Sequence, residues 1–343
     1  GFRYIELTGL TEEPTLDTVS GVFVHQDVED LSQFRCSDDF INKLYYLGKM
    51  STLSNLFYMP TDCPTREKLG WANDAQASAE QMLTNFNVVK LFKKWMVDII
   101  DSIREDGAIP GIIPTSGFGY EWGTGPVSSG VLFEIPYKIY LYTGNKDLLC
   151  ENIPYFKKHL NYIRSRADND ELIGYGLCDW AGPYEHLEAS PTPVKFTDTI
   201  LYIKCLKIAM LAAELSDNSA DYSEFKNELN RITEIFMNAF LNEDGTCKVD
   251  EQTAVSMLIY HDVYYELEPL KQQLKRCVEK HSFHHYCGMV GLRHLYEALN
   301  KCGLHDYAFK IIKAEGYPSY SEWIKGGATT LWETWQPGNS KNH

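Results

Sequence analysis

The sequence predicts an all-α fold in which antiparallel helix pairs close into a ring, preceded by a short N-terminal β segment. Apolar residues recur with the period of a helix from about Ser37 to the end of the chain. The glycine-containing connections at 144–145 and 303 are so short that the helices they join must run antiparallel. About a dozen helices without a repeat of fixed length favour a closed ring over an open solenoid.

The expected elements follow in chain order. Residues 2–7 and 20–27 are rich in β-forming side chains and predict two strands. Asp38 or Asp39 is expected to cap a first helix that ends near Leu56. The later helices are expected at 74–86, 88–104, 128–143, 146–166, 197–215, 221–241, 251–260, 263–280, 288–301, 304–315 and 319–325. Two long segments between them, 105–127 and 167–196, carry many glycines, prolines and aromatic residues, which predicts loops at the rim of a binding pocket.

Composition excludes several classes of function. A length of 343 residues suffices for one large domain or two smaller ones, and the formal net charge of −15 argues against a nucleic-acid or anionic-membrane partner. Nine cysteines without a Cys-x-x-Cys pair indicate free thiols. The sequence shows no ligand spacing typical of a zinc site, so we expect no metal and no other cofactor. The first residue is Gly1 and not methionine, so the sequence leaves the compartment open. It also leaves the oligomeric state open.

Residues 61–76 are the most informative stretch of the chain. Pro64 and Gly70 interrupt any helix there, so the stretch predicts a fixed loop that leads into a helix capped by Asn73 or Asp74. Charged residues beside an indole are poor core material and typical of a site carried by a loop. The candidate site residues in this loop are Asp62, Arg66, Glu67, Trp71 and Asp74.

Two sequence motifs carry a family resemblance. Residues 62–71 (DCPTREKLGW), with Asp74 three positions later, resemble a signature of the α-L-rhamnosidases of glycoside hydrolase family 78. Residues 317–319 (YPS) and 326–335 (GGATTLWETW) resemble that family's second signature, which ends in Trp-Glu-x-Trp. The two matches stand in the expected order near opposite ends of the chain, so a coincidence of motifs is a poor explanation.

The resemblance implies a more specific fold. It implies an (α/α)6 barrel, a six-hairpin toroid, over residues 31–343, with the site at one mouth. Residues 1–30 would then be the last strands of a preceding β-sandwich region, and the chain would stop before a C-terminal β-domain.

The resemblance also implies an inverting glycosidase that removes α-L-rhamnosyl residues from an oligosaccharide or glycoside. Glu67 would be the general acid, and Glu333 the general base. Inversion requires roughly 6.5–9.5 Å between the two carboxyl groups, so that a water fits between the base and the sugar. The expected substrate-binding residues are Asp62, Arg66, Trp71, Asp74, Trp122, Asp179, Trp180, Trp335 and His343.

Each of these residues also has a structural alternative. Asp62 and Arg66 could form a salt bridge, and Asp74 could serve only as a helix cap. The four tryptophans could belong to the core, and His343 could lie in a frayed terminus.

The chain also departs from the family pattern. Cys178 replaces the glycine of the family's Gly-Asp-Trp at Asp179-Trp180. The family commonly carries Trp-Gly-Asp before a Pro-aromatic pair, whereas residues 128–130 (SSG) precede that pair here. A glycosidase of the same barrel acting on another sugar is therefore an alternative. A catalytically silent carbohydrate-binding domain is another, although the retention of both carboxylates argues against it.

Overall fold

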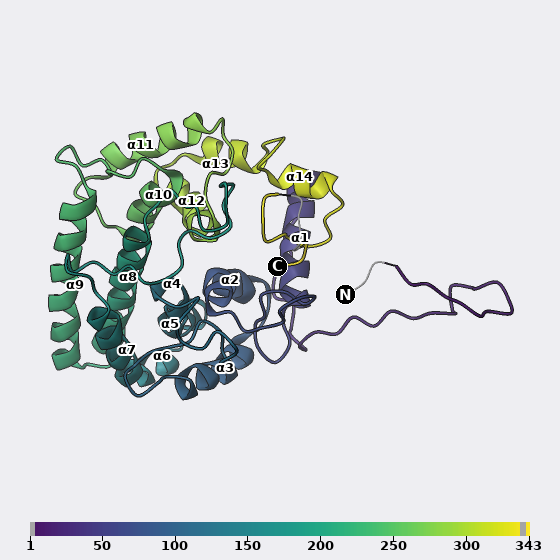
Figure 1. The fold of residues 1–343 in the computed structure, drawn as a ribbon, viewed down its shortest axis with the longest axis horizontal. Helices are drawn as coiled ribbons and strands as arrows, with labels where there is room; N and C mark the ends of the chain where they lie inside the picture. The colour runs from purple at the N-terminus through teal and green to yellow at the C-terminus, as the bar shows by residue number, and fades with distance from the viewer. Residues whose placement is uncertain (1–3, 337–340) are drawn as a thin grey trace.

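The computed structural model describes residues 4–336 and 341–343, and this part of the chain is almost entirely helical (Figure 1). Its helices are α1 (Asp39–Ser54), α2 (Ala72–Asn85), α3 (Val89–Asp101), α4 (Pro126–Ser129), α5 (Val131–Thr143), α6 (Asp147–Glu151), α7 (Ile153–Ser165), α8 (Val194–Leu215), α9 (Ser219–Phe240), α10 (Gln252–His261), α11 (Leu267–Lys280), α12 (Met289–Lys301), α13 (His305–Ile312) and α14 (Tyr320–Lys325). All the helices expected from the sequence are present, with small shifts at their ends.

Two of the expected helices are each divided into two. The helix expected at 128–143 breaks at Gly130 between α4 and α5, where a Cβ atom would lie 2.6 Å from the Pro126 carbonyl oxygen. The helix expected at 146–166 breaks at Asn152 between α6 and α7. Pro154 lies in the first turn of α7, where a proline is tolerated because no intrahelical N–H bond is lost.

The helices form a double ring (Figure 1). Helices α2, α5, α8, α10 and α12 pack side by side in the interior, and α3, α7, α9, α11 and α13 pack outside them. Sequence explains the two layers: α8 and α10 are buried on nearly all sides, whereas α3 and α11 bury one apolar stripe and expose the other face. This arrangement confirms the expected all-α toroid.

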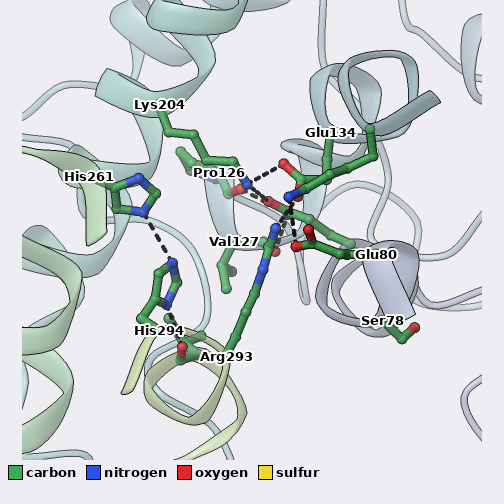
Figure 2. A network of polar contacts seen from close by, with 12 residues as sticks. Ser78, Glu80, Pro126, Val127, Glu134, Lys204, His261, Arg293 and His294 are labelled. Carbon is green, nitrogen blue, oxygen red and sulfur yellow. Dashed lines mark hydrogen bonds and ion pairs between the residues drawn. The ribbon is translucent and has the colours of Figure 1, made fainter. Parts of the chain in front are cut away.

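Charged side chains meet in the interior of the ring (Figure 2). Glu134 of α5 is fully buried, with its Oε2 atom 2.5 Å from Nζ of Lys204 on α8 and its other oxygen paired with Arg293 on α12. Burial opposes the charge of Glu134, but the two cations outweigh it and lower the pKa to about 2. His261 of α10 contacts His294 of α12 through their Nε2 atoms, 3.1 Å apart. These contacts link four of the inner helices, and an unpaired charge there would be costly.

The N-terminal segment differs from the expectation. Residues 4–7 and 20–27 form no strand, and residues 2–3 lie outside the described part of the chain. Figure 1 shows this segment running away from the helices, with Tyr4 92% and Val22 83% exposed. The two strand predictions are therefore wrong for the described residues, because a strand needs a partner for its N–H and C=O groups. The expected domain boundary near residue 30 stays a prediction.

Two other expectations concern cysteines and membranes. All nine cysteines are free, and most are buried, as the scatter of their positions predicted. Within residues 4–336 and 341–343, no helix is both long and apolar enough to cross a membrane.

Candidate active site

Several loops that precede inner helices converge at one mouth of the ring. They precede α2, α4 and α8, and the start of α12 and the segment after α14 join them. Together they enclose a cavity of about 240 Å³. Its lining combines carboxylates with aromatic and apolar side chains: Glu67, Leu69, Trp71, Asn73, Asp74, Phe118, Trp122, Leu177, Trp180, Met289, Glu333 and His343.

Glu67 and Glu333 both line this cavity, with Arg66 beside them. The Nη2 atom of Arg66 lies 2.9 Å from Oε2 of Glu333 and 4.0 Å from Oε1 of Glu67. These two carboxylate oxygens are therefore at most about 7 Å apart, so both groups belong to one site. The guanidinium of Arg66 pairs with Glu333, so the alternative of a structural salt bridge between Arg66 and Asp62 is not what the structure shows.

The loop that carries Glu67 is held by its own hydrogen bonds. Trp71 donates its indole N–H to Oε2 of Glu67 over 2.6 Å, which fixes the carboxylate against the cavity wall. The backbone N–H of Glu67 donates to the sulfur of Cys63. Asp62 is buried and accepts the backbone N–H of Leu69 over 2.9 Å. Asp62 therefore shapes the loop from beneath and does not line this cavity.

Asp74 and His343 form a second polar pair in the lining. Helix α2 begins at Ala72 with Trp71 at the N-cap, so the expectation that Asn73 or Asp74 caps it is wrong. Asp74 instead lies in the first turn, where its Oδ1 atom is 2.6 Å from Nε2 of His343. Burial opposes a charged imidazole, but Asp74 and other nearby carboxylates outweigh it and raise the pKa of His343 to about 9. The pair is therefore an ion pair at neutral pH.

Aromatic rings form one wall of the cavity. Trp122 lies in contact with Trp71, Phe118 and Trp180, at centroid distances of 5.6, 5.2 and 6.0 Å. The loops before α2, α4 and α8 each contribute at least one of these rings. The expected aromatic lining is therefore assembled from distant segments, and a wall of this kind suits the apolar face of a sugar.

Comparison with known proteins identifies the family. Residues 29–343 match the family model described as the bacterial alpha-L-rhamnosidase 6 hairpin glycosidase domain. The chain belongs to this family. Two curated α-L-rhamnosidases of Formosa agariphila are 28% and 30% identical to it over 100% and 98% of its length. The chain spans 39% and 37% of those two proteins, which is less than half of each.

Solved structures agree with the six-hairpin fold. The structure of an α-L-rhamnosidase from Dictyoglumus thermophilum matches the chain with a TM-score of 0.90 and 30% identity. The match covers 97% of the chain and 38% of the Dictyoglumus thermophilum chain. The Streptomyces avermitilis α-L-rhamnosidase complexed with L-rhamnose matches 93% of the chain and 32% of its own with a TM-score of 0.86 and 24% identity.

Two residues expected in this six-hairpin site lie behind its wall. Asp179 is fully buried and accepts hydrogen bonds from Tyr184, Thr253 and the backbone N–H groups of Gly288 and Gly291. Burial raises its pKa, against the opposing effect of these donors. Because Asp179 precedes Trp180 and is bonded to the start of α12, we assign it to positioning the wall.

Trp335 is the other such residue: it is absent from the lining of the cavity of about 240 Å³, although it contributes to the lining of a larger hollow beside it. It is 4% exposed and stacks on Trp323 at 4.8 Å and on His285 at 4.5 Å. Its role in the structure is mainly that of a core residue that supports the segment carrying Glu333.

The family-pattern departure at 128–130 lies outside the cavity lining. Ser128 and Ser129 are buried in the short helix α4, and neither lines the cavity of about 240 Å³. Other lining residues gave little signal in the sequence. Phe118 lies in the aromatic-rich loop before α4, whereas Leu177, before α8, and Met289, at the start of α12, are apolar residues of no distinctive pattern.

A second, larger cavity adjoins the first. Its volume is about 760 Å³, and it shares Glu67, Trp180 and Glu333 with the smaller one. The remaining lining comes mainly from residues 182–188 and 334–336. The two carboxylates of the six-hairpin site therefore stand at the junction of two hollows.

One group of described residues has side chains of the kind that bind a metal ion. Asp62, Cys63 and Glu67 each place a ligand atom within 4.8 Å of the others. Burial and the neighbouring Asp62 raise the pKa of Cys63, so the thiol stays protonated, whereas a metal binds the thiolate. The indole of Trp71 also occupies one oxygen of Glu67. This donor set therefore fits a metal ion poorly.

Proposed function

We propose that this six-hairpin domain hydrolyses terminal α-L-rhamnosyl bonds with inversion, using Glu67 as general acid and Glu333 as general base. The observation that carries the proposal is the meeting of these two carboxylates across Arg66 in one aromatic-walled cavity. The printed names of the relatives support the sugar, since they are α-L-rhamnosidases and one solved relative is complexed with L-rhamnose.

The chemistry divides between the two carboxyl groups. Glu67 donates a proton to the glycosidic oxygen as its bond to the anomeric carbon breaks. Glu333 accepts a proton from a water molecule that attacks the same carbon from the opposite face. The products are a free sugar of inverted configuration and a neutral leaving alcohol. In the next turnover Glu67 regains a proton, and Glu333 loses one.

Exposure favours this assignment of roles. The side chain of Glu67 is 39% exposed and faces the larger cavity as well, whereas that of Glu333 is 13% exposed. An acid must reach a leaving oxygen on the open side of the sugar, and a base must hold one water out of bulk solvent. Arg66, bonded to Glu333, orients that carboxylate.

The rest of the cavity fits a deoxy sugar. Rhamnose carries a C6 methyl group, which the indoles of Trp71, Trp122 and Trp180 cover as an apolar wall. The Asp74–His343 ion pair offers an acceptor and a donor to sugar hydroxyls at the other side of the lining.

The decisive experiment is a time-resolved proton NMR assay with an aryl α-L-rhamnoside. We expect β-L-rhamnose as the first product, before mutarotation. First release of the α anomer would exclude the inverting mechanism. Hydrolysis only of a different aryl glycoside would favour the alternative sugar, and sugar binding without any turnover would favour a silent binding domain.

A further inference from the structure

We propose that the cavity of about 760 Å³ is a leaving-group site that favours neutral saccharides and disfavours anionic ones. This inference rests on the proposed function. It concerns the larger cavity, which lies beyond Glu67 and Glu333. The sequence motifs made no prediction about the selectivity of this cavity.

The position of the acid decides which cavity holds which half of the substrate. Glu67 must reach the glycosidic oxygen, so the bond to be cut lies at the residues that both cavities share: Glu67, Trp180 and Glu333. The smaller cavity, of about 240 Å³ and walled by aromatic rings, holds one sugar unit. The leaving group therefore extends into the larger cavity.

Carboxylates dominate the charge of the larger cavity. Its lining includes the carboxylates of Glu67, Glu185, Glu188 and Glu333. The cationic or basic groups of the lining are Arg66 and His186. Arg66 is already paired with Glu333 at 2.9 Å and lies 4.0 Å from Glu67, so its charge is largely neutralised. The net field in this hollow is negative.

The segment that carries Glu185 and Glu188 is a closed loop. The backbone N–H of Ala181 donates to the carbonyl of Leu187 over 3.1 Å, which closes the loop at its base. The thiol of Cys178 donates to the carbonyl of Glu188. Glu185 and Glu188 are exposed, so both side chains are free to meet a leaving group. Their backbone is therefore held at the cavity while their carboxylates stay available.

This loop packs onto an aromatic floor. A Cβ atom on Gly182 would lie 2.2 Å from the ring of Tyr184, so the backbone of Gly182 lies directly against that ring. Tyr184 is 7% exposed, and its hydroxyl donates to Asp179. Trp180 also lines this cavity. An aromatic floor beneath acceptor carboxylates suits a neutral sugar, whose hydroxyls donate hydrogen bonds and whose C–H face stacks.

An anionic leaving group meets repulsion in the same place. A carboxylate on the leaving group would share this hollow with the carboxylates of Glu185 and Glu188, and each such like-charge pair is unfavourable by a small amount in solvent. We expect the sum to lower kcat/KM by about ten-fold at low ionic strength, and salt to screen most of it.

The test uses two substrates that differ by one charge: 4-carboxyphenyl and 4-carbamoylphenyl α-L-rhamnoside. We expect kcat/KM of the wild-type domain to favour the carbamoyl compound by about ten-fold at low salt, and the preference to fall several-fold in 0.5–1 M salt, where the Debye length is only about 3–4 Å. Equal values, or a preference for the carboxylate at low salt, would overturn the inference.

The double variant Glu185→Gln/Glu188→Gln assigns the effect to the loop. We expect it to reduce the preference to about two- to three-fold, because it removes the two carboxylates of the lining that neither pair with Arg66 nor carry the proton of the acid. The matched control is Glu151→Gln/Glu214→Gln, which changes the net charge equally at exposed positions of α6 and α8 and should keep the wild-type ratio. If both double variants change the ratio of the two kcat/KM values equally, the inference is overturned.

Failure of the proposed function is a different result. Wild-type protein that cleaves neither aryl rhamnoside refutes the proposed rhamnosidase activity, and the inference with it. Cleavage of both compounds at equal rates refutes only the inference. The wild-type salt dependence needs no variant, so a misfolded double variant leaves the test intact.

Discussion

The Nη2 atom of Arg66 lies 2.9 Å from Oε2 of Glu333, although 267 positions separate the two residues. Arg66 belongs to the loop before α2, and Glu333 to the segment after α14. Because Arg66 adjoins Glu67 in the sequence, this one ion pair brings the two candidate catalytic carboxylates to the same cavity. A guanidinium that neutralises one carboxylate also lets the second approach it closely.

We expect Arg66→Gln to lower kcat by about 10–100-fold with a smaller change in KM, since it frees Glu333 and misplaces a catalytic group. Steady-state kinetics with an aryl α-L-rhamnoside measure both constants. The matched control is Arg276→Gln on the exposed face of α11, which should keep wild-type kinetics. A change confined to KM would instead make Arg66 a simple binding residue.

We expect Glu67→Gln and Glu333→Gln each to lower kcat by about 10²–10⁴, since each removes an acid–base role. The two variants should differ in their dependence on the leaving group. A dinitrophenyl rhamnoside needs no proton on departure, so it should restore much of the activity of Glu67→Gln and little of that of Glu333→Gln. Equal recovery of both variants would contradict the assigned roles.

The Asp74–His343 pair predicts a pH dependence of stability. The pKa of His343 is raised from 6.5 to about 9, so the pair stabilises the fold fully below pH 6.5 and loses this effect as the pH rises through 9. A shift of this size corresponds to about 3 kcal/mol in the free energy of unfolding. We therefore expect Asp74→Asn to destabilise the protein at pH 6 and far less at pH 10, as measured by urea unfolding.

The control for this measurement is Asp306→Asn on the exposed first turn of α13, which should affect stability equally at both pH values. If Asp74→Asn has the same effect at pH 6 and pH 10, the ion pair contributes nothing through the titration of His343.

We expect Asp179→Asn to destabilise the protein by about 2–4 kcal/mol and to raise KM for the rhamnoside. Four donors point at this carboxylate, and an amide would turn its own N–H₂ group toward some of them. The milder Thr253→Val variant removes one donor and should cost about 1 kcal/mol. Urea unfolding and KM are measured together: lost stability with an unchanged KM would make Asp179 purely structural and refute its role in positioning Trp180.

Much of the helical architecture could be predicted because it depends on local pattern. Asp38 caps α1 as expected, because its side chain accepts from the N–H groups of Phe40 and Ile41. The cap of α2 was mispredicted because Asp74 is drawn to His343, a partner that only the fold supplies. The prediction of two strands at the N-terminus was wrong for a related reason. A residue's β propensity describes its fit to a sheet, and no partner strand lies beside the described residues there.

The sequence by itself determined which residues have the chemistry: the motif around Glu67, the motif around Glu333 and the aromatic loops between them. Only the tertiary structure decided their relations. It paired Arg66 with Glu333 and not with Asp62, and it placed Asp179 behind the wall. Side-chain periodicity reports on neighbours within a helix, whereas these contacts join segments whose approach depends on how the whole ring closes.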